Sequence, residues 1–352
     1  MSLPTWKHGG VIGTTSSEST AGPAGLTSVR TPRQLDWYEK CRIPGALRPL
    51  GRFGLVPMAT SLPQFIKIAQ AIARNADHNG ICGWRGQANA EWRVESGAAR
   101  RVQKPWLEHF GRDREIVQEV LEKLGAKTAR EAIAGSPGSS QHADAVRGYE
   151  RLMLNQARVN GFGHHDGRRL SDLELLANLQ HHGAATNLLD VTKNLLVALW
   201  MASSEPEFDN KPGVVIAFGQ SALWTTDDAT AQLPLLEWMR LPGAGTRTTK
   251  YWIPSKLNLR IVAQSGFFVL SPIVDEPWGA LDLRGTVIWD TEETAHIDDP
   301  DCYFIGVSRR LKEEMRDAQK YGLFPYAQNT IYPDLPGFAD YHSARRDVPF
   351  FA

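Results

Sequence analysis

Cysteine is scarce, and none of the cysteines is spaced for a disulfide framework or a metal site. Cys41, Cys82 and Cys302 occur singly among 352 residues, and no CxxC or CxxH pair is present. Small secreted domains that depend on disulfides, and structural zinc sites, both need clustered cysteines. We therefore expect a protein of a reducing compartment, without a bound metal.

Long hydrophobic runs are missing as well. The longest apolar run, residues 195–202, is far shorter than the roughly 20 residues that span a bilayer. The first residues, from Met1 to Lys7, lack the basic-then-apolar pattern of a secretory signal. These absences predict a soluble, cytoplasmic protein without a membrane partner.

An excess of charge of either sign is missing too. The chain has 39 Lys and Arg against 39 Asp and Glu, so no overall field attracts nucleic acid or an anionic membrane. P-loops, Gly-x-Ser-x-Gly elbows and carboxylate pairs at glycosidase-like spacing are absent, which leaves the common NTPase and hydrolase classes without local support. A hydrophobic share of 42% is nevertheless enough for a buried core.

Helical periodicity is the clearest pattern that is present. Apolar residues recur at helical spacing in the segments 62–74, 113–125, 145–159, 171–183, 192–202 and 308–320. Ser171 and Glu174 match a capping box, which marks a helix start, and Gly183 is a natural end for that helix. Thr192 is the expected N-cap of the apolar helix that follows. Residues 134–144 form a polar Gly/Ser break between helices.

Short segments rich in β-branched or aromatic residues predict strands. These segments are residues 81–84, 213–218, 260–263, 266–270, 286–289 and 302–307. Helices thus come first and strands later, which predicts the α+β class, with a helical N-terminal half packed on a mixed, mainly antiparallel sheet. Because residues 9–32 are rich in Gly, Ser, Thr and Pro, we expect a partly flexible extension over residues 1–60. One domain should cover residues 61–340, followed by a tail over 341–352.

An arginine beside a glycine is the first candidate for chemistry. In Trp84-Arg85-Gly86-Gln87, the arginine follows a predicted strand, and its fork-shaped guanidinium suits phosphate groups. Gly86 would allow a ligand to approach the backbone closely. The alternative is a structural arginine that pairs with a carboxylate.

The segment 180–192 is the second candidate, because it places seven hydrogen-bonding side chains around a helix end, a short strand and the next helix start. Polar groups so close to two apolar helices need partners, which either a ligand or their neighbours can supply. On the second alternative, Asp190 and Thr192 cap the following helix and His181 is a core histidine. A metal site at His181 and His182 is disfavoured, because adjacent helical residues point about 100° apart.

A lone polar residue between two apolar runs is the third candidate. Gln264 separates residues 259–263 from residues 266–270. It fits a turn between strands, or an inward-facing polar residue on the floor of a cleft.

In their order and spacing these motifs resemble the FRG domain family. The family's hallmarks are an aromatic-Arg-Gly motif, a Gln-His-x-Gly-x-x-Thr-x-Leu-Leu-Asp-x-Thr-x-Asn block and a later Arg-Ile-x-x-Gln-x-Gly-x-Phe pair of strands. The matching segments are residues 84–87, 180–194 and 260–267, and residues 331–338 resemble the family's terminal Pro-Asp-Leu-x-Gly element. The chain departs from the family at Asn187 and Val191, where Arg and Trp are common, and Asn187 removes a cation that could contact phosphate.

The resemblance also implies a fold similar to that of ADP-ribosyltransferases, with a cleft that binds NAD. The residues that it assigns to NAD binding are Arg85, Gly86, Gln180, Thr186 and Thr192. Asp190 or Gln264 would stabilise the positive charge on the ribose. His181 would act as a general base toward the acceptor, or orient Asp190.

The resemblance implies an NAD-consuming toxin or phage-defence enzyme, with an antitoxin or defence-system partner. Such an enzyme would transfer ADP-ribose to a protein, a nucleic acid or water. One alternative is a nucleotide- or nucleic-acid-binding module without catalysis. Another is an interaction scaffold whose cleft recognises a peptide.

Overall fold

The computed structural model describes residues 37–76, 80–102, 140–219, 224–225, 231–235, 250–254, 259–270 and 302–341. Strands of the main sheet are β1 (Ala46–Pro49), β2 (Leu55–Ala59), β3 (Ile81–Gln87), β6 (Leu189–Thr192), β7 (Gly213–Gly219), β8 (Trp224–Thr225), β9 (Lys250–Trp252), β10 (Gly266–Leu270) and β11 (Cys302–Val307). A separate hairpin consists of β4 (His164–His165) and β5 (Arg168–Arg169).

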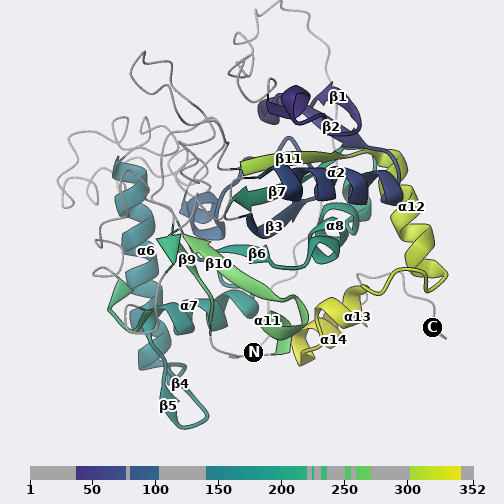
Figure 1. The fold of residues 1–352 in the computed structure, drawn as a ribbon. Coiled ribbons are helices and arrows are strands. Elements are labelled where there is room, and N and C mark those ends of the chain that lie inside the picture. The colour runs from purple at the N-terminus through teal and green to yellow at the C-terminus, as the bar shows by residue number, and fades with distance from the viewer. Residues whose placement is uncertain are drawn as a thin grey trace, which may run out of the picture.

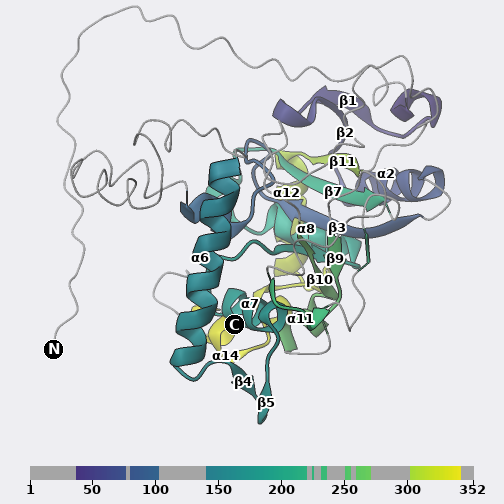
Figure 2. The same ribbon diagram turned by 90° about the vertical axis from the view of Figure 1, so that its left-hand side faces the viewer.

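The helices are α2 (Leu62–Asn75), α6 (Ser140–Val159), α7 (Asp172–His181), α8 (Leu195–Ser203), α11 (Leu259–Ala263), α12 (Arg309–Lys320), α13 (Gln328–Ile331) and α14 (Leu335–Tyr341). Two short 3-10 helices are η1 (Gly51–Phe53) and η2 (Pro206–Phe208). The helices surround a sheet at the centre of the described residues (Figure 1). In Figure 2, α6 stands beside the sheet on the side away from α2.

In the described part of the chain, the main sheet has nine strands in the order β1-β2-β11-β7-β3-β6-β10-β9-β8. Neighbouring strands pair antiparallel except β2 with β11 and β8 with β9, which are parallel. The predicted α+β class and the mixed, mainly antiparallel sheet are therefore confirmed.

The central position of β7 in the sheet explains why its sequence is continuously apolar. All seven of its residues are buried, and successive side chains of a strand point to opposite faces of the sheet. Val215 and Ala217 belong to a core that α2, α8 and α12 cover, whereas Ile216 and Phe218 belong to a second core on the other face. A strand that is covered on both faces needs apolar residues at every position.

A third core contains Phe268 of β10 together with leucines of α6 and α7. Phe268 pairs across the strands with Asp190 of β6. Trp84, which belongs to the α8 core, pairs with Thr192 of the same strand. Because Asp190 and Thr192 are two residues apart on one strand, all these side chains lie on one face of the sheet. The α8 core and the α7 core therefore share that face, with Asp190 and Thr192 between them.

Three of the predicted helices are confirmed together with their starts. Helix α2 covers the segment 62–74, and α12 covers the segment 308–320 with Ser308 as its N-cap. The hydroxyl of Ser171 accepts a hydrogen bond from the backbone N–H of Glu174, and the Glu174 carboxylate accepts one from the Ser171 N–H. This pair is the predicted capping box of α7.

Two predictions of secondary structure are wrong, one for residues 260–263 and one for Thr192. Residues 260–263 belong to helix α11 rather than to a strand, because a run this short does not distinguish the two by periodicity. Thr192 is the last residue of β6, and its hydroxyl donates to the backbone oxygen of Gln264 at 2.5 Å. Asn194 caps α8 instead, since its side-chain oxygen accepts hydrogen bonds from two backbone N–H groups of that helix.

The predicted order of helices before strands is also wrong, because β1, β2 and β3 come from the first quarter of the chain. β1 and β2 belong to the segment 1–60, so this part of the predicted extension joins the sheet. Helix α6 begins at Ser140, inside the predicted break at 134–144. The predicted helix 113–125 and strand 286–289 lie outside the described residues. Over the described ranges, no helix is long and apolar enough to cross a membrane.

Candidate functional site

The sheet splits between β3 and β6, and a cleft opens at the split. β3 pairs with β7 along its length but meets β6 through one residue pair, Trp84 with Thr192. Beyond this pair, the Nη1 of Arg85 donates a hydrogen bond to the backbone oxygen of Asp190 at 2.8 Å. The cleft has a volume of about 730 Å³ and is lined by residues of β3, α7, β6, α8, α11 and the segment 328–340.

Six of the eight predicted site residues line this cleft. They are Arg85, Gly86, Gln180, His181, Asp190 and Gln264. Thr186 and Thr192 are buried beside it and hold its lining in place. The Thr186 hydroxyl donates to the side-chain oxygen of Gln180, and the Thr192 hydroxyl accepts a hydrogen bond from the Asn194 N–H at 2.9 Å.

Arg85 brings a positive charge to the floor of the split. Burial and the nearby Arg100 lower its pKa, and Asp190 raises it, but a guanidinium keeps its proton at any physiological pH. Its Nε is buried and has no hydrogen-bond partner in the described part of the chain. Its contact with Asp190 is to the backbone oxygen, so donor capacity remains for a ligand.

The structure gives a reason for a glycine at position 86 that the sequence did not reveal. A Cβ at this position would lie 1.9 Å from the backbone oxygen of Ala198 and 2.8 Å from the backbone nitrogen of Ala202. Helix α8 therefore packs directly on β3 here, and the missing side chain makes room for the helix rather than for a ligand. The backbone of Gly86 still belongs to the cleft lining.

Asp190 places a carboxylate on β6, beside the split. Its Oδ1 accepts a hydrogen bond from the Nε2 of Gln180 at 2.8 Å, and Thr186 in turn holds the other end of Gln180. Burial raises the pKa of the Asp190 carboxyl, while Arg85, Gln180 and Arg260 oppose that rise. Its side chain is crowded by protein but still reaches solvent, so solvent screening limits the rise.

His181 is a neutral imidazole at the wall of the cleft. Burial, followed by the charges of Arg260 and His182, lowers its pKa to about 4. Its Nε2 is buried without a partner among the described residues, and its ring stands edge-on to Phe268 with 6.4 Å between centroids. Because a group of such low pKa is a weak base at neutral pH, His181 suits a hydrogen bond better than proton abstraction. Gln180, not His181, holds Asp190.

Sequence comparison assigns the part of the chain that forms one side of this cleft. Residues 81–211 match the FRG domain family. Neither a search of curated proteins nor a search of solved structures gave a match. The FRG segment runs from β3 to just beyond η2, so it supplies Arg85, Gln180, His181 and Asp190. Gln264 lies outside it.

The wall opposite the FRG segment comes from α11 and the C-terminal helices. Gln264 was a predicted site residue, whereas Arg260 and Asp334 on this wall were not. Arg260 forms an ion pair with Asp334 at 2.8 Å, and its guanidinium lies 4.7 Å above the ring of Tyr332. Arg260 also donates to the backbone oxygen of His181 at 3.2 Å, which ties the two walls together. Arg260 and Asp334 both stood in motifs that resemble the family, and this was the signal available for them.

Gln264 joins the same wall to the cleft. Its Nε2 donates to the backbone oxygen of Ile331 at 3.2 Å, and its backbone oxygen accepts from Thr192. The predicted position on the floor of a cleft is compatible with its place in the lining. Its amide nitrogen, however, is engaged in holding α13.

The lining combines opposite charges with flat rings. The charged residues in it are Arg85, Arg93, Arg100, Arg260, Asp190, Glu205, Glu207 and Asp340, and the aromatic ones are Trp92, Trp200 and Tyr332. Guanidinium groups bind phosphates, and aromatic faces stack with bases. In the described part of the chain, no group of three or more His, Cys, Asp and Glu side chains could hold a metal ion. The arrangement therefore suits a ligand with both phosphates and planar rings.

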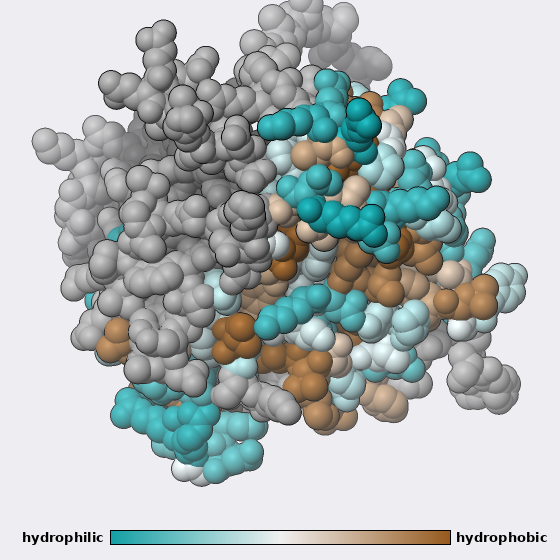
Figure 3. All heavy atoms as spheres, in the orientation of Figure 1, coloured by the Kyte–Doolittle hydropathy of each residue, from teal (hydrophilic) through white to brown (hydrophobic). Residues whose placement is uncertain are grey.

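Apolar side chains gather near the rim of the cleft. Leu259 and Val262 of α11 are exposed, and so are Leu335 and Phe338 of α14. Figure 3 shows apolar residues, in brown, over the part of this face where α11 and α14 lie in Figure 1. Both helices also contribute residues to the cleft lining.

Proposed function

We propose that this chain is an NAD-consuming, ADP-ribosyltransferase-like enzyme that transfers ADP-ribose to a protein or nucleic-acid acceptor. The observation that carries the proposal is the split between β3 and β6, where the guanidinium of Arg85 and the carboxylate of Asp190 line one cleft of about 730 Å³. Clefts of this size accommodate ligands of cofactor size. The setting that we propose is a toxin or phage-defence effector with an antitoxin or defence-system partner.

Two neighbouring arginines of the cleft support a dinucleotide as the ligand. The pyrophosphate would lie against Arg85 and Arg100, two cations close enough that Arg100 lowers the pKa of Arg85. A bound pyrophosphate offsets that repulsion between like charges. The two ring systems of the ligand would pack against aromatic faces such as Trp92 and Tyr332.

The reaction breaks the bond between the ribose C1′ and the nicotinamide nitrogen. The electron pair leaves with nicotinamide, and C1′ becomes an oxocarbenium-like centre with positive charge. The Asp190 carboxylate, held by Gln180, would stabilise that charge. The acceptor then forms a bond to C1′ and loses a proton to solvent or to a base of its own. His181 would donate or accept a hydrogen bond to the ligand, since its low pKa makes it a weak base.

A non-catalytic nucleotide-binding module is the second candidate, and Gln264 is the observation that favours it. The resemblance to ADP-ribosyltransferases places a glutamate, or in divergent members a glutamine, at this point of the cleft. Gln264 has no charge, and its amide nitrogen is bound to Ile331. Such a module would bind NAD or a nucleotide without releasing nicotinamide.

The test is nicotinamide release from NAD by the purified full chain, measured with and without a lysate that contains protein and RNA. The proposal predicts release that Arg85→Ala abolishes, while the melting temperature changes little because the Arg85 side chain makes one hydrogen bond to the described part of the chain. Arg309→Ala, which removes an exposed arginine of α12, is the matched control and should keep full activity. NAD binding without release would favour the module. Absence of both binding and release by the folded chain would contradict both candidates.

A further inference from the structure

Another cavity lies at the opposite end of α7 from the cleft. It has a volume of about 470 Å³ and is lined by residues of α6, β5, the start of α7 and the segment 231–235. Helix α7 has 10 residues, which corresponds to a length of about 15 Å. The end of α7 at Gln180 and His181 lines the cleft, whereas its start at Ser171 and Asp172 lines this cavity.

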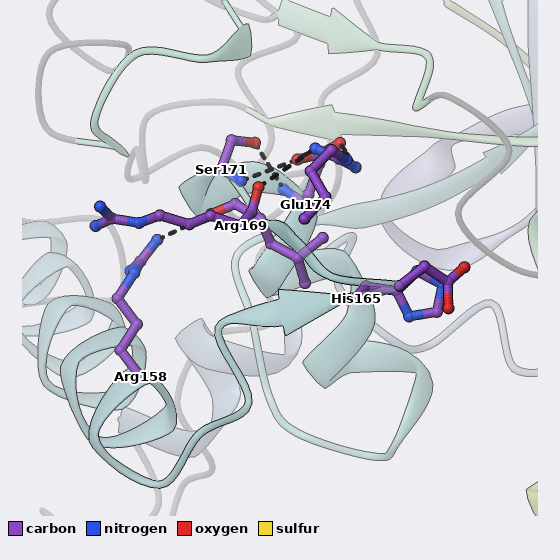
Figure 4. Close-up of polar contacts among 8 residues, drawn as sticks. Arg158, His165, Arg169, Ser171 and Glu174 are labelled. Carbon is purple, nitrogen blue, oxygen red and sulfur yellow. Dashed lines mark hydrogen bonds and ion pairs between the residues drawn. The ribbon is translucent and has the colours of Figure 1, made fainter.

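Three arginines enter this cavity from two elements. Arg151 and Arg158 are seven residues apart on α6, so they lie on one face of that helix. Arg169 comes from β5, and Figure 4 shows that the side chains of Arg158 and Arg169 come from separate elements. Arg151 and Arg169 are both exposed. This convergence places three guanidinium groups around one space.

Among the described lining residues, a carboxylate neutralises one of these three arginines, Arg158. Asp172 is the one carboxylate among the described lining residues, and both of its oxygens are occupied. Its Oδ1 lies 2.6 Å from Arg158 and its Oδ2 accepts from the Leu235 N–H at 2.8 Å. Glu174 is outside the lining and is bound by Arg168 at 2.8 Å. Three positive charges against one negative charge give the described lining a net charge of +2.

The remaining donors and the floor of the cavity define what it can bind. The Nε of Arg158 is buried without a partner among the described residues. The floor includes the buried side chains of Leu154, Leu170 and Leu235. Small-molecule sites are cavities of about 300–1,000 Å³ that combine apolar walls with a few polar groups.

We propose that this cavity binds a phosphate monoester of mononucleotide size. The phosphate would accept hydrogen bonds from Arg151, Arg158 and Arg169, and the organic part would cover the leucines of the floor. Arginine forks match phosphate oxygens, and a bound dianion would offset the two uncompensated charges. This site does not depend on the proposed NAD chemistry, because it shares no lining residue with the cleft.

The experiment is calorimetric titration of the full chain with AMP, ribose 5-phosphate, inorganic phosphate and adenosine. AMP should bind more tightly than inorganic phosphate, and adenosine should not bind, because the arginines recognise the phosphate. The double variant Arg151→Ala and Arg169→Ala should weaken AMP binding by about tenfold or more, as expected when charge-assisted hydrogen bonds are lost. Since neither side chain has a partner among the described residues, the melting temperature of this double variant should not change.

Two control variants separate this site from general charge effects and from the cleft. Arg309→Ala with Arg310→Ala removes two exposed arginines of α12, so it makes the same change in net charge and should leave AMP binding intact. Arg85→Ala should abolish nicotinamide release while keeping AMP binding at this cavity. The proposal is overturned if the folded chain does not bind AMP. It is equally overturned if the α12 variant weakens binding as much, or if Arg85→Ala alone removes it.

Discussion

The absence of a side chain at Gly86 allows helix α8 to pack directly on β3, beside the split of the sheet. A methyl group there would overlap the backbone of α8 at Ala198, and backbone atoms of a packed helix do not move aside as a flexible side chain does. We expect Gly86→Ala to lower the free energy of unfolding by about 3 kcal/mol or more. Chemical denaturation measures this change.

Gly148 provides the control for that substitution. It is an exposed glycine of helix α6, and a Cβ there would meet no atom within 4 Å. Gly148→Ala should therefore raise the free energy of unfolding by up to about 1 kcal/mol, because alanine favours the helix. Equal effects of the two substitutions would contradict the packing argument.

Asp190 is the residue whose charge the proposed reaction needs. Asp190→Asn keeps an oxygen for the hydrogen bond from Gln180 but removes the negative charge. We expect nicotinamide release to fall by about 100-fold or more, the usual cost of losing one electrostatic stabiliser in an active site. The melting temperature should stay the same or rise, because burial already raises the pKa of this carboxyl. Asp166→Asn, in the exposed turn between β4 and β5, should leave release unchanged.

At the scale of elements, α6 is tied to the segment before β6 by a buried carboxylate. One oxygen of Glu150 accepts a hydrogen bond from the Asn187 N–H at 2.6 Å, and the other has no partner among the described residues. Burial raises the pKa of Glu150 to about 7. The folded chain therefore holds this proton more tightly than the unfolded chain, in which the carboxyl has its ordinary pKa of about 4.5.

The sign of the resulting pH dependence follows from that difference. Below about pH 4.5 the carboxyl is protonated in both states, and the folded state loses stability as pH rises through the window from 4.5 to 7. Glu150→Gln keeps the acceptor for Asn187 and removes the charge. The free energy of unfolding of this variant should exceed that of the natural chain by an amount that grows as pH rises through this window. The difference should reach up to about 3 kcal/mol at pH 8. Denaturation curves of both chains at pH 5 and pH 8 measure this difference. A difference of equal size at the two pH values would contradict the expectation.

The elements also show what the sequence could predict. Helices α2, α7 and α12 carry their own start signals, since Ser61, Ser171 and Ser308 cap them through local hydrogen bonds. Thr192 looked equally suitable as a cap, yet pairing of β6 with β3 and β10 keeps it in a strand. Tertiary pairing decided that assignment, and such pairing is not visible in local periodicity.

At the scale of the whole molecule, the cleft is built from segments that lie far apart in the chain. The residues that resemble the FRG motifs could be predicted to lie close together, and Arg85, Gln180 and Asp190 line one cleft. The split between β3 and β6 could not, because it depends on where a short strand stops pairing. Arg260 and Asp334 are 74 positions apart in the sequence, and no local sequence pattern indicates a partner at that separation.

This long-range ion pair should control how tightly the cleft holds its ligand. Asp334 binds both Arg260 at 2.8 Å and the Gly337 N–H at 2.9 Å, so it connects α11 to the start of α14. Asp334→Ala should lower the free energy of unfolding by about 1–2 kcal/mol, the loss expected for a hydrogen bond to a charged group. It should also weaken NAD binding by about tenfold, because Arg260 and Tyr332 lose the contact that positions them in the wall.

Asp317→Ala, which removes an exposed carboxylate of α12, should change neither quantity. Calorimetry with NAD and denaturation of both variants test this, and unchanged NAD affinity in Asp334→Ala would show that this wall does not take part in binding.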